Sequence, residues 1–140
     1  MSGTDVFLTA DGLWARAESK ASVAEAMVDD RKNCREAWYN AGVAMEFALK
    51  SVISRRRGFN RWPDKAGNEA IYTHDLRVLF REAGLNVSQV PKSLRGALQT
   101  AFEWDRLHDY LPMTMKRSVA RSMVNAVCYE KGLLAWLKTL

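Results

Sequence analysis

The most constraining feature of this chain is a helical spacing of apolar residues along almost its whole length. Apolar side chains recur every three or four positions in successive segments, and no segment shows the alternation typical of a strand. The first two segments contain the stripes Trp14, Ala17, Ala21, Ala24, Val28 and then Cys34, Trp38, Ala41, Met45, Ala48, Val52. The pattern predicts an all-α fold, an up-and-down bundle of five helices.

Glycine and cap residues predict where the helices begin and end. Gly58 follows a run of three arginines and is expected to end the second helix. Residues 58–72 contain glycine, proline and asparagine at short intervals, which indicates an irregular loop. Thr73 is expected to be the N-cap of the third helix, with Asp75 placed to interact with its dipole, and Gly84 is expected to end it.

The remaining two helices are predicted from prolines and apolar spacing. Pro91 suits the first turn of the fourth helix, and Pro112 separates it from the last one. The last helix is expected to run as one element over residues 119–137. The apolar stripes on the second and last helices exceed what one neighbour each could cover. We therefore expect a homodimer, with a thicker monomer core as the alternative.

Size and charge limit the class of protein. The chain has 140 residues, which predicts one domain over 1–140 with a sizeable core. Its apolar content of 48% is too high for a disordered chain. The net charge of +5 favours anionic partners such as nucleic acid or nucleotides, although the same charge also keeps a small protein soluble.

Cysteine usage and hydropathy indicate no cofactor and no membrane. Cys34 and Cys128 lie in helical patterns without a neighbouring ligand pair, so we expect core thiols and no metal site. No apolar run is long enough to span a bilayer, and the first residues do not resemble a signal peptide. The sequence therefore predicts a cytoplasmic protein.

Residues 37–79 resemble a known family. A long helical pattern carries Glu46 and Lys50, a basic loop follows, and the next helix starts at Thr73-His74-Asp75. This order resembles the HEPN domains of prokaryotes, small helical bundles linked to nucleotide and RNA chemistry. The resemblance implies a HEPN-type bundle over nearly the whole chain. It also implies an RNA- or nucleotide-associated function in a toxin–antitoxin or defence system, a groove shared by two subunits, and a small nucleotidyltransferase as a possible partner.

Arg106, His108 and Tyr110 are similar to the active-site signature of the ribonucleases in that family. In those enzymes the arginine precedes the histidine by four to six residues, whereas Arg106 stands two residues before His108 and positions 102–104 hold no arginine. A histidine can relay protons from the RNA 2′-hydroxyl, and an arginine can stabilise charge on the phosphate, without a metal. Two interpretations stay open: a metal-independent ribonuclease, and a non-catalytic dimerising adaptor with a degenerate motif. In the second interpretation, His108 and Tyr110 form hydrogen bonds with backbone groups at a helix end.

A basic-aromatic cluster lies where the second helix meets the loop. Arginines can hold phosphates while a ring stacks on a base. The alternative is a solvated helix end, with cations complementing the dipole and aromatic side chains pinning the loop to the bundle. The candidate nucleic-acid-binding residues are Arg55, Arg56, Arg57, Arg61 and Trp62.

Glu46 and Lys50 stand four residues apart and predict a polar pair on the second helix. The simpler interpretation is an i,i+4 ion pair worth roughly 0.2–0.5 kcal/mol. Because their neighbours are apolar, a partly buried contact that faces the active groove is the alternative. His74 could face a ligand, but capping by Thr73 accounts for that short motif without it.

Overall fold

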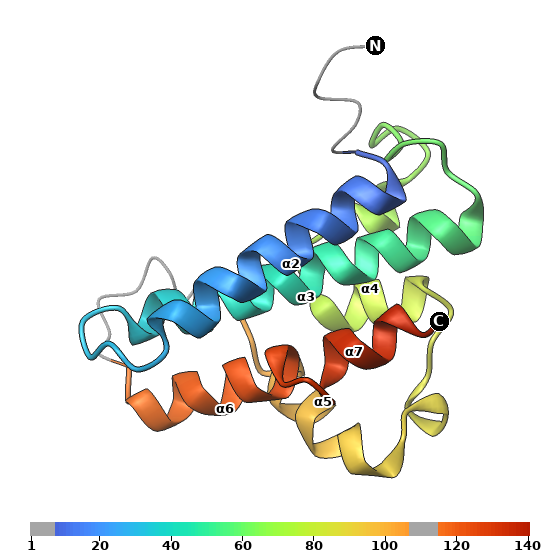
Figure 1. Ribbon diagram of the computed structural model, residues 1–140. Helices are drawn as coiled ribbons and strands as arrows, with labels where there is room; N and C mark the ends of the chain where they lie inside the picture. The colour runs from blue at the N-terminus through green and yellow to red at the C-terminus, as the bar shows by residue number, and fades with distance from the viewer. Residues whose placement is uncertain (1–7, 107–114) are drawn as a thin grey trace.

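Helices form the regular structure of the residues that the computed structural model describes, 8–106 and 115–140, and no strand occurs within those ranges (Figure 1). The fold class predicted from apolar spacing, an all-α helical bundle, is confirmed. The α-helices are α2 (Ala10–Met27), α3 (Cys34–Arg57), α4 (Leu76–Glu82), α5 (Arg95–Phe102), α6 (Arg117–Cys128) and α7 (Leu133–Lys138). Short 3-10 turns cover Glu69–Ile71, Val87–Gln89 and Lys92–Leu94.

Helix α3 is the element on which the others pack. It contacts α2, α4, α6 and α7, and α2 runs antiparallel along it (Figure 1). Its central residues Met45, Leu49 and Ile53 are fully buried. The apolar stripe of the second helix is therefore covered by several helices of the same chain, in agreement with the alternative of a thicker monomer core. No helix within the described ranges has the length and apolar content needed to cross a bilayer.

The predicted end of α3 is confirmed, whereas the predicted start of α4 is wrong. Gly58 adopts the left-handed conformation at φ 70°, and the chain leaves the helix there. The N-cap of α4 is Asp75, not Thr73: the Asp75 carboxylate accepts from the N–H of Arg77 at 2.9 Å. The Thr73 hydroxyl instead accepts from the N–H of Asp75 at 3.1 Å. This local turn keeps His74 outside the helix.

The predicted last helix is interrupted. Helix α6 ends at Cys128, and α7 begins after a turn in which the N–H of Gly132 donates to the carbonyl of Tyr129 at 2.7 Å. A Cβ at Gly132 would lie 2.9 Å from the carbonyl oxygen of Ala126, so the turn needs glycine there. The glycine is the sequence signal for this break, which the uninterrupted apolar spacing concealed.

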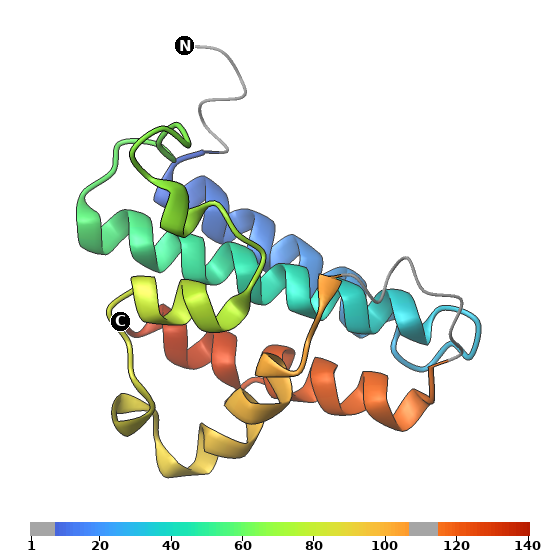
Figure 2. The ribbon, with the colours of Figure 1, turned by 180° about the vertical axis from the view of Figure 1, so that it is seen from behind.

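The segment after α5 returns to the middle of α3 (Figure 2). Trp104 is buried there between Trp38 and Tyr39, with ring centroids 6.1 Å and 6.2 Å away. This return brings Arg106, far along the chain from α3, to the face of α3 that carries Glu46.

Candidate functional site

A buried carboxylate forms the centre of the candidate site. Glu46 of α3 is only 3% exposed, and a buried carboxylate is costly unless charged groups and hydrogen bonds compensate it. Each of its two carboxylate oxygens lies 3.1 Å from Nδ1 of His74. Oε2 also lies 3.2 Å from Nζ of Lys50, and Oε1 lies 3.7 Å from Nη1 of Arg106. We call Tyr39, Glu46, Lys50, His74 and Arg106 the Glu46 cluster.

Arg106 closes the cluster from the outside. Its Nη1 lies 2.5 Å from Nδ1 and 2.9 Å from Nε2 of His74, and its Nε donates to the hydroxyl of Tyr39 at 3.3 Å. A guanidinium only donates, so the imidazole must accept from it. Nδ1 of the imidazole lies closest to both Glu46 and Arg106, so the tautomer of His74 determines which of these contacts are hydrogen bonds.

Three separate elements position this cluster. Tyr39, Glu46 and Lys50 follow one another at helical spacing on α3, which places them on one side of that helix. His74 comes from the turn that Thr73 and Asp75 hold before α4. Arg106 follows the buried Trp104 in the returning segment. The site therefore depends on the tertiary fold and not on any one helix.

An open cavity of about 620 Å³ lies against the outer side of the cluster. His74 and Arg106 line it together with Arg77, whose guanidinium lies 5.4 Å from the ring centroid of the half-buried Phe102. Asp75, Glu103 and Asp105 also line it, so the cavity has no strong excess of either charge. Its arginines and its aromatic ring are the groups that bind phosphates and bases.

The three residues predicted to be catalytic divide between the described and the undescribed parts of the chain. Arg106 lies in the Glu46 cluster, whereas His108 and Tyr110 lie outside the described residues, so their roles stay predictions. The histidine that Arg106 contacts is His74, which the sequence analysis had set aside as part of a helix start. The signal that could have found it is Glu46: a carboxylate among apolar residues needs a partner, and the chain has two histidines.

The predicted Glu46–Lys50 pair is present as an i,i+4 ion pair, and it also contributes to the site. The Lys50 side chain is 14% exposed, and its ammonium lies 5.4 Å from the ring centroid of Trp62. The carboxylate of Glu46 contacts two residues that line the cavity. The ion-pair interpretation is therefore confirmed, whereas a contact that faces an active groove stays a prediction, because neither Glu46 nor Lys50 lines the cavity.

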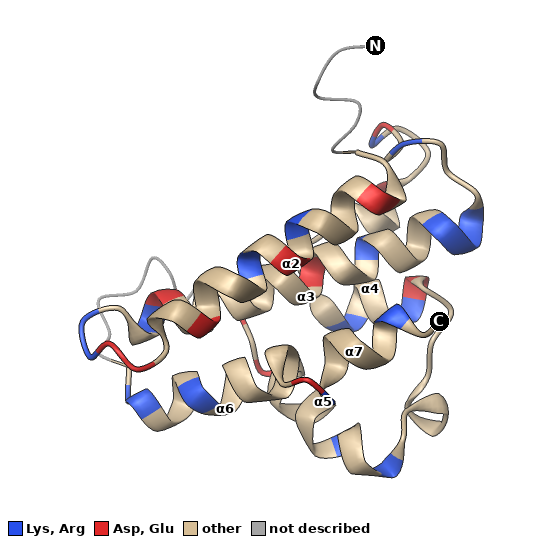
Figure 3. Cartoon of the chain, viewed as in Figure 1, with Lys and Arg blue, Asp and Glu red and all other residues tan. Residues whose placement is uncertain are grey.

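The predicted basic cluster gathers at the C-terminal end of α3 (Figure 3). Arg56 donates to the carbonyl of Ala83 at 3.1 Å, and Arg57 donates to the carbonyl of Glu82 at 2.8 Å and to its carboxylate at 2.7 Å. Arg55 donates to the carbonyl of Leu140 at 3.2 Å. These contacts satisfy carbonyls at the end of α4 and at the C-terminus, and each guanidinium has further donors.

Trp62 belongs to the packing of the loop on the bundle. Trp62 is 9% exposed, and its backbone N–H donates to the carbonyl of Leu8 at 2.7 Å. The centroid of its ring lies 6.4 Å from that of Phe59 and 6.3 Å from that of Tyr72. This burial agrees with the alternative in which the aromatic side chains pin the loop. Binding of nucleic acid by the arginines stays a prediction.

Neither metal ligation nor a known relative adds to this description. Among the described residues, no group of three or more His, Cys, Asp or Glu side chains could hold a metal ion. Comparisons with protein-family models, curated proteins and solved structures found no match to the chain.

Proposed function

We propose that this chain is a HEPN-like, RNA- or nucleotide-associated protein that holds a phosphate group in the cavity beside Arg106. The observation that carries the proposal is the contact between Arg106 and His74 above the buried Glu46. A carboxylate in the core fixes the imidazole and the guanidinium in one place, at the edge of a cavity. A preoriented guanidinium loses less side-chain entropy when it binds a phosphate.

The donors of Arg106 suit a phosphate oxygen. Its side chain is 34% exposed and lines the cavity. A guanidinium has five N–H donors in a planar fork and binds phosphate through two of them. Arg77 lines the same cavity and supplies a second cation. Phe102, beside Arg77, gives a base a ring on which to stack.

The same geometry bears on whether the protein cleaves RNA. In the ribonuclease interpretation, Arg106 stabilises charge on the phosphate, His108 relays protons and Tyr110 supports them, without a metal. His74 lies between Glu46 and Arg106, with Nδ1 3.1 Å from the carboxylate and 2.5 Å from Nη1 of Arg106. This packed arrangement favours the second candidate, a non-catalytic binding module, for the described part of the site.

An assay with total cellular RNA tests the proposal and separates its two forms. We expect the protein to bind RNA in a salt-sensitive manner. If it is a ribonuclease, cleavage survives EDTA and His108→Ala abolishes it while the helical circular dichroism signal stays unchanged. If it is a binding module, the wild type slows the migration of RNA in a native gel and leaves the RNA at its full length. A protein that neither binds nor cleaves RNA or nucleotides at low ionic strength would refute both forms.

The biological setting follows from the same proposal. We infer that the chain is a cytoplasmic protein of a toxin–antitoxin or defence system and that it acts as a homodimer. A small nucleotidyltransferase is its proposed partner protein. The family resemblance supports this inference, whereas the apolar stripe of α3 is covered within the chain by α2, α4, α6 and α7. Light scattering after size exclusion, at several protein concentrations, measures the oligomeric state directly.

A further inference from the structure

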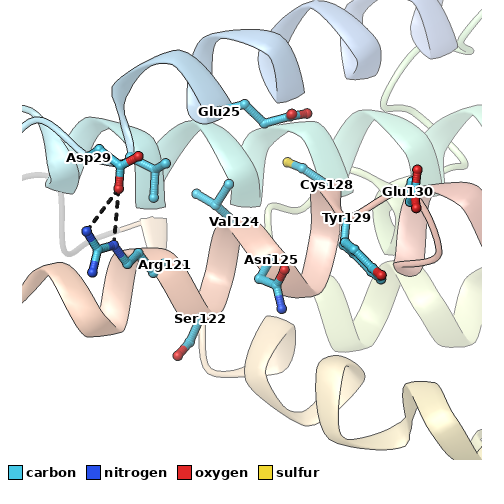
Figure 4. Close-up of a pocket in the computed structure, with 10 residues that line it drawn as sticks. Glu25, Asp29, Arg121, Ser122, Val124, Asn125, Cys128, Tyr129 and Glu130 are labelled. Carbon is cyan, nitrogen blue, oxygen red and sulfur yellow. Dashed lines mark hydrogen bonds and ion pairs between the residues drawn. The ribbon is translucent and has the colours of Figure 1, made fainter.

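A second cavity, away from the Glu46 cluster, lies between α2 and α6. It is an open groove of about 680 Å³, and Figure 4 shows the side chains that line it. Val28 from the end of α2 and Val124 and Cys128 from α6 form an apolar surface within it. We call it the α2–α6 groove. The proposed phosphate site does not use any of its residues.

The groove is acidic although the chain as a whole is basic. Glu25, Asp29 and Glu130 line it, against one cation, Arg121. Arg121 is already paired, because its Nε and Nη2 lie 3.2 Å and 3.0 Å from one oxygen of Asp29. Within the described residues, Glu25 and Glu130 have no ion-pair partner. Two uncompensated carboxylates in a chain of net charge +5 favour a cationic ligand.

Other groups around the groove also favour a cation with an apolar stem. Tyr129 is 51% exposed at the C-cap of α6, so its ring is accessible to a cation. The last turn of α6 has no basic residue to complement the partial negative charge at its C-terminal end. Burial and, to a smaller extent, the charge of Glu25 raise the pKa of the Cys128 thiol to about 12. The thiol therefore stays neutral and contributes to the apolar surface.

We propose that the α2–α6 groove binds a lysine-bearing basic segment of a partner protein. The aliphatic part of a lysine side chain would lie on Val28, Val124 and Cys128, and its ammonium would lie between Glu25 and Glu130, beside Tyr129. An open groove accepts a segment of chain in which apolar residues alternate with lysines. Charge complementarity selects this occupant, because the one cation that lines the groove, Arg121, is already paired with Asp29, whereas Glu25 and Glu130 are not paired within the described residues.

Fluorescence anisotropy with a short labelled peptide in which Lys and Leu alternate tests the proposal. We expect salt-sensitive binding, and none with the same peptide carrying Glu in place of Lys. Glu25→Gln/Glu130→Gln should weaken binding about tenfold, and Tyr129→Ala by about threefold. The matched control is Glu18→Gln/Glu36→Gln, which changes the net charge equally at positions outside the groove. Backbone amide shifts on titration should be largest along Val124–Tyr129.

Several outcomes would overturn the proposal. One is equal weakening by the two double variants, because bulk charge would then account for binding. Another is a Lys-Leu peptide that binds the Glu25→Gln/Glu130→Gln protein as well as the wild type. A third is a dimer by light scattering that dissociates in the groove variant, because a second copy of the chain would then be the occupant. Thermal melts of every variant, expected to match the wild type, exclude unfolding as the cause.

Discussion

The indole of Trp104 lies directly on Gly42, at a point of α3 between Tyr39 and Glu46. A Cβ at position 42 would lie 1.9 Å from Cε2 of Trp104 and 2.0 Å from its Nε1, closer than any side chain permits. The segment that carries Arg106 therefore reaches α3 only because residue 42 has no side chain. Gly42 is thus a positioning residue for the Glu46 cluster.

Gly42→Ala should destabilise the protein and displace Arg106. We expect the free energy of unfolding to fall by about 1–3 kcal/mol, because the added methyl forces Trp104 from its place. Urea unfolding followed by circular dichroism measures this change. Gly96→Ala on α5 is the matched control: a Cβ there meets nothing within 4 Å, so we expect equal stability, or a gain of about 0.5–1 kcal/mol. Equal stability of Gly42→Ala and wild type would contradict the described packing.

Glu46→Gln should weaken both the fold and the site. The amide keeps the size of the side chain but removes the charge that compensates Lys50 and fixes His74. We expect about 2 kcal/mol lower stability, since breaking a buried ionic network leaves its partners unpaired. Glu18→Gln, an exposed change on α2, should stay within about 0.5 kcal/mol of wild type. A Glu46→Gln protein as stable as this control would show that the cluster contributes little to folding.

The Cys128 thiol should resist alkylation and make stability depend on pH in the alkaline range. Its pKa of about 12 in the folded protein, against 9.0 for an ordinary thiol, means that the unfolded chain loses this proton first. The contribution of this thiol to the free energy of unfolding is thus fully present below pH 9. It falls by about 1 kcal/mol per pH unit between pH 9 and 12. Urea unfolding of wild type and Cys128→Ala measures the difference between their pH profiles. Parallel profiles, or fast native alkylation by iodoacetamide at pH 8, would rule this out.

The basic cluster should bind polyanions through donors that the carbonyl interactions leave available. Replacing Arg55, Arg56, Arg57 and Arg61 with Ala should weaken RNA binding and make its salt dependence shallower, by about one log-log unit for each phosphate that the protein no longer neutralises. Because three of these arginines also satisfy backbone carbonyls, unfolding curves must accompany the titration. A control with Ala at Lys20, Lys32, Lys92 and Lys131 removes the same charge. If it weakens binding as much, bulk charge accounts for the binding. If the wild type shows no salt-sensitive RNA binding at low ionic strength, the cluster is structural.

Local signals predicted the helices well and the site only in part. Gly58 and the apolar stripes of α2 and α3 act within a few residues, so their consequences were readable from the sequence. The start of α4 was misassigned because Thr73 and Asp75 are both good caps, and the choice between them depends on the turn geometry.

Long-range interactions account for the part of the site that the sequence did not predict. The Glu46–Lys50 pair was predictable because it lies within one helix. The approach of His74 to Glu46 depends on how the loop of residues 58–75 crosses α3, and its approach to Arg106 depends on Trp104 fitting Gly42. No regular spacing of residues in the sequence predicts either of these contacts. Only the presence of a carboxylate on an apolar helix face indicated that partners from elsewhere were needed.

We propose that Arg106 holds a phosphate of RNA or a nucleotide. The most direct test is a titration of labelled single-stranded RNA at several salt concentrations, with wild type, Arg106→Ala and Arg121→Ala. Arg121 is the control because its replacement removes the same charge from the α2–α6 groove, away from the proposed phosphate site. We expect about tenfold weaker binding and a shallower salt slope, by roughly one unit, for Arg106→Ala alone. Binding by Arg106→Ala equal to wild type, or equal weakening in both variants, would contradict it.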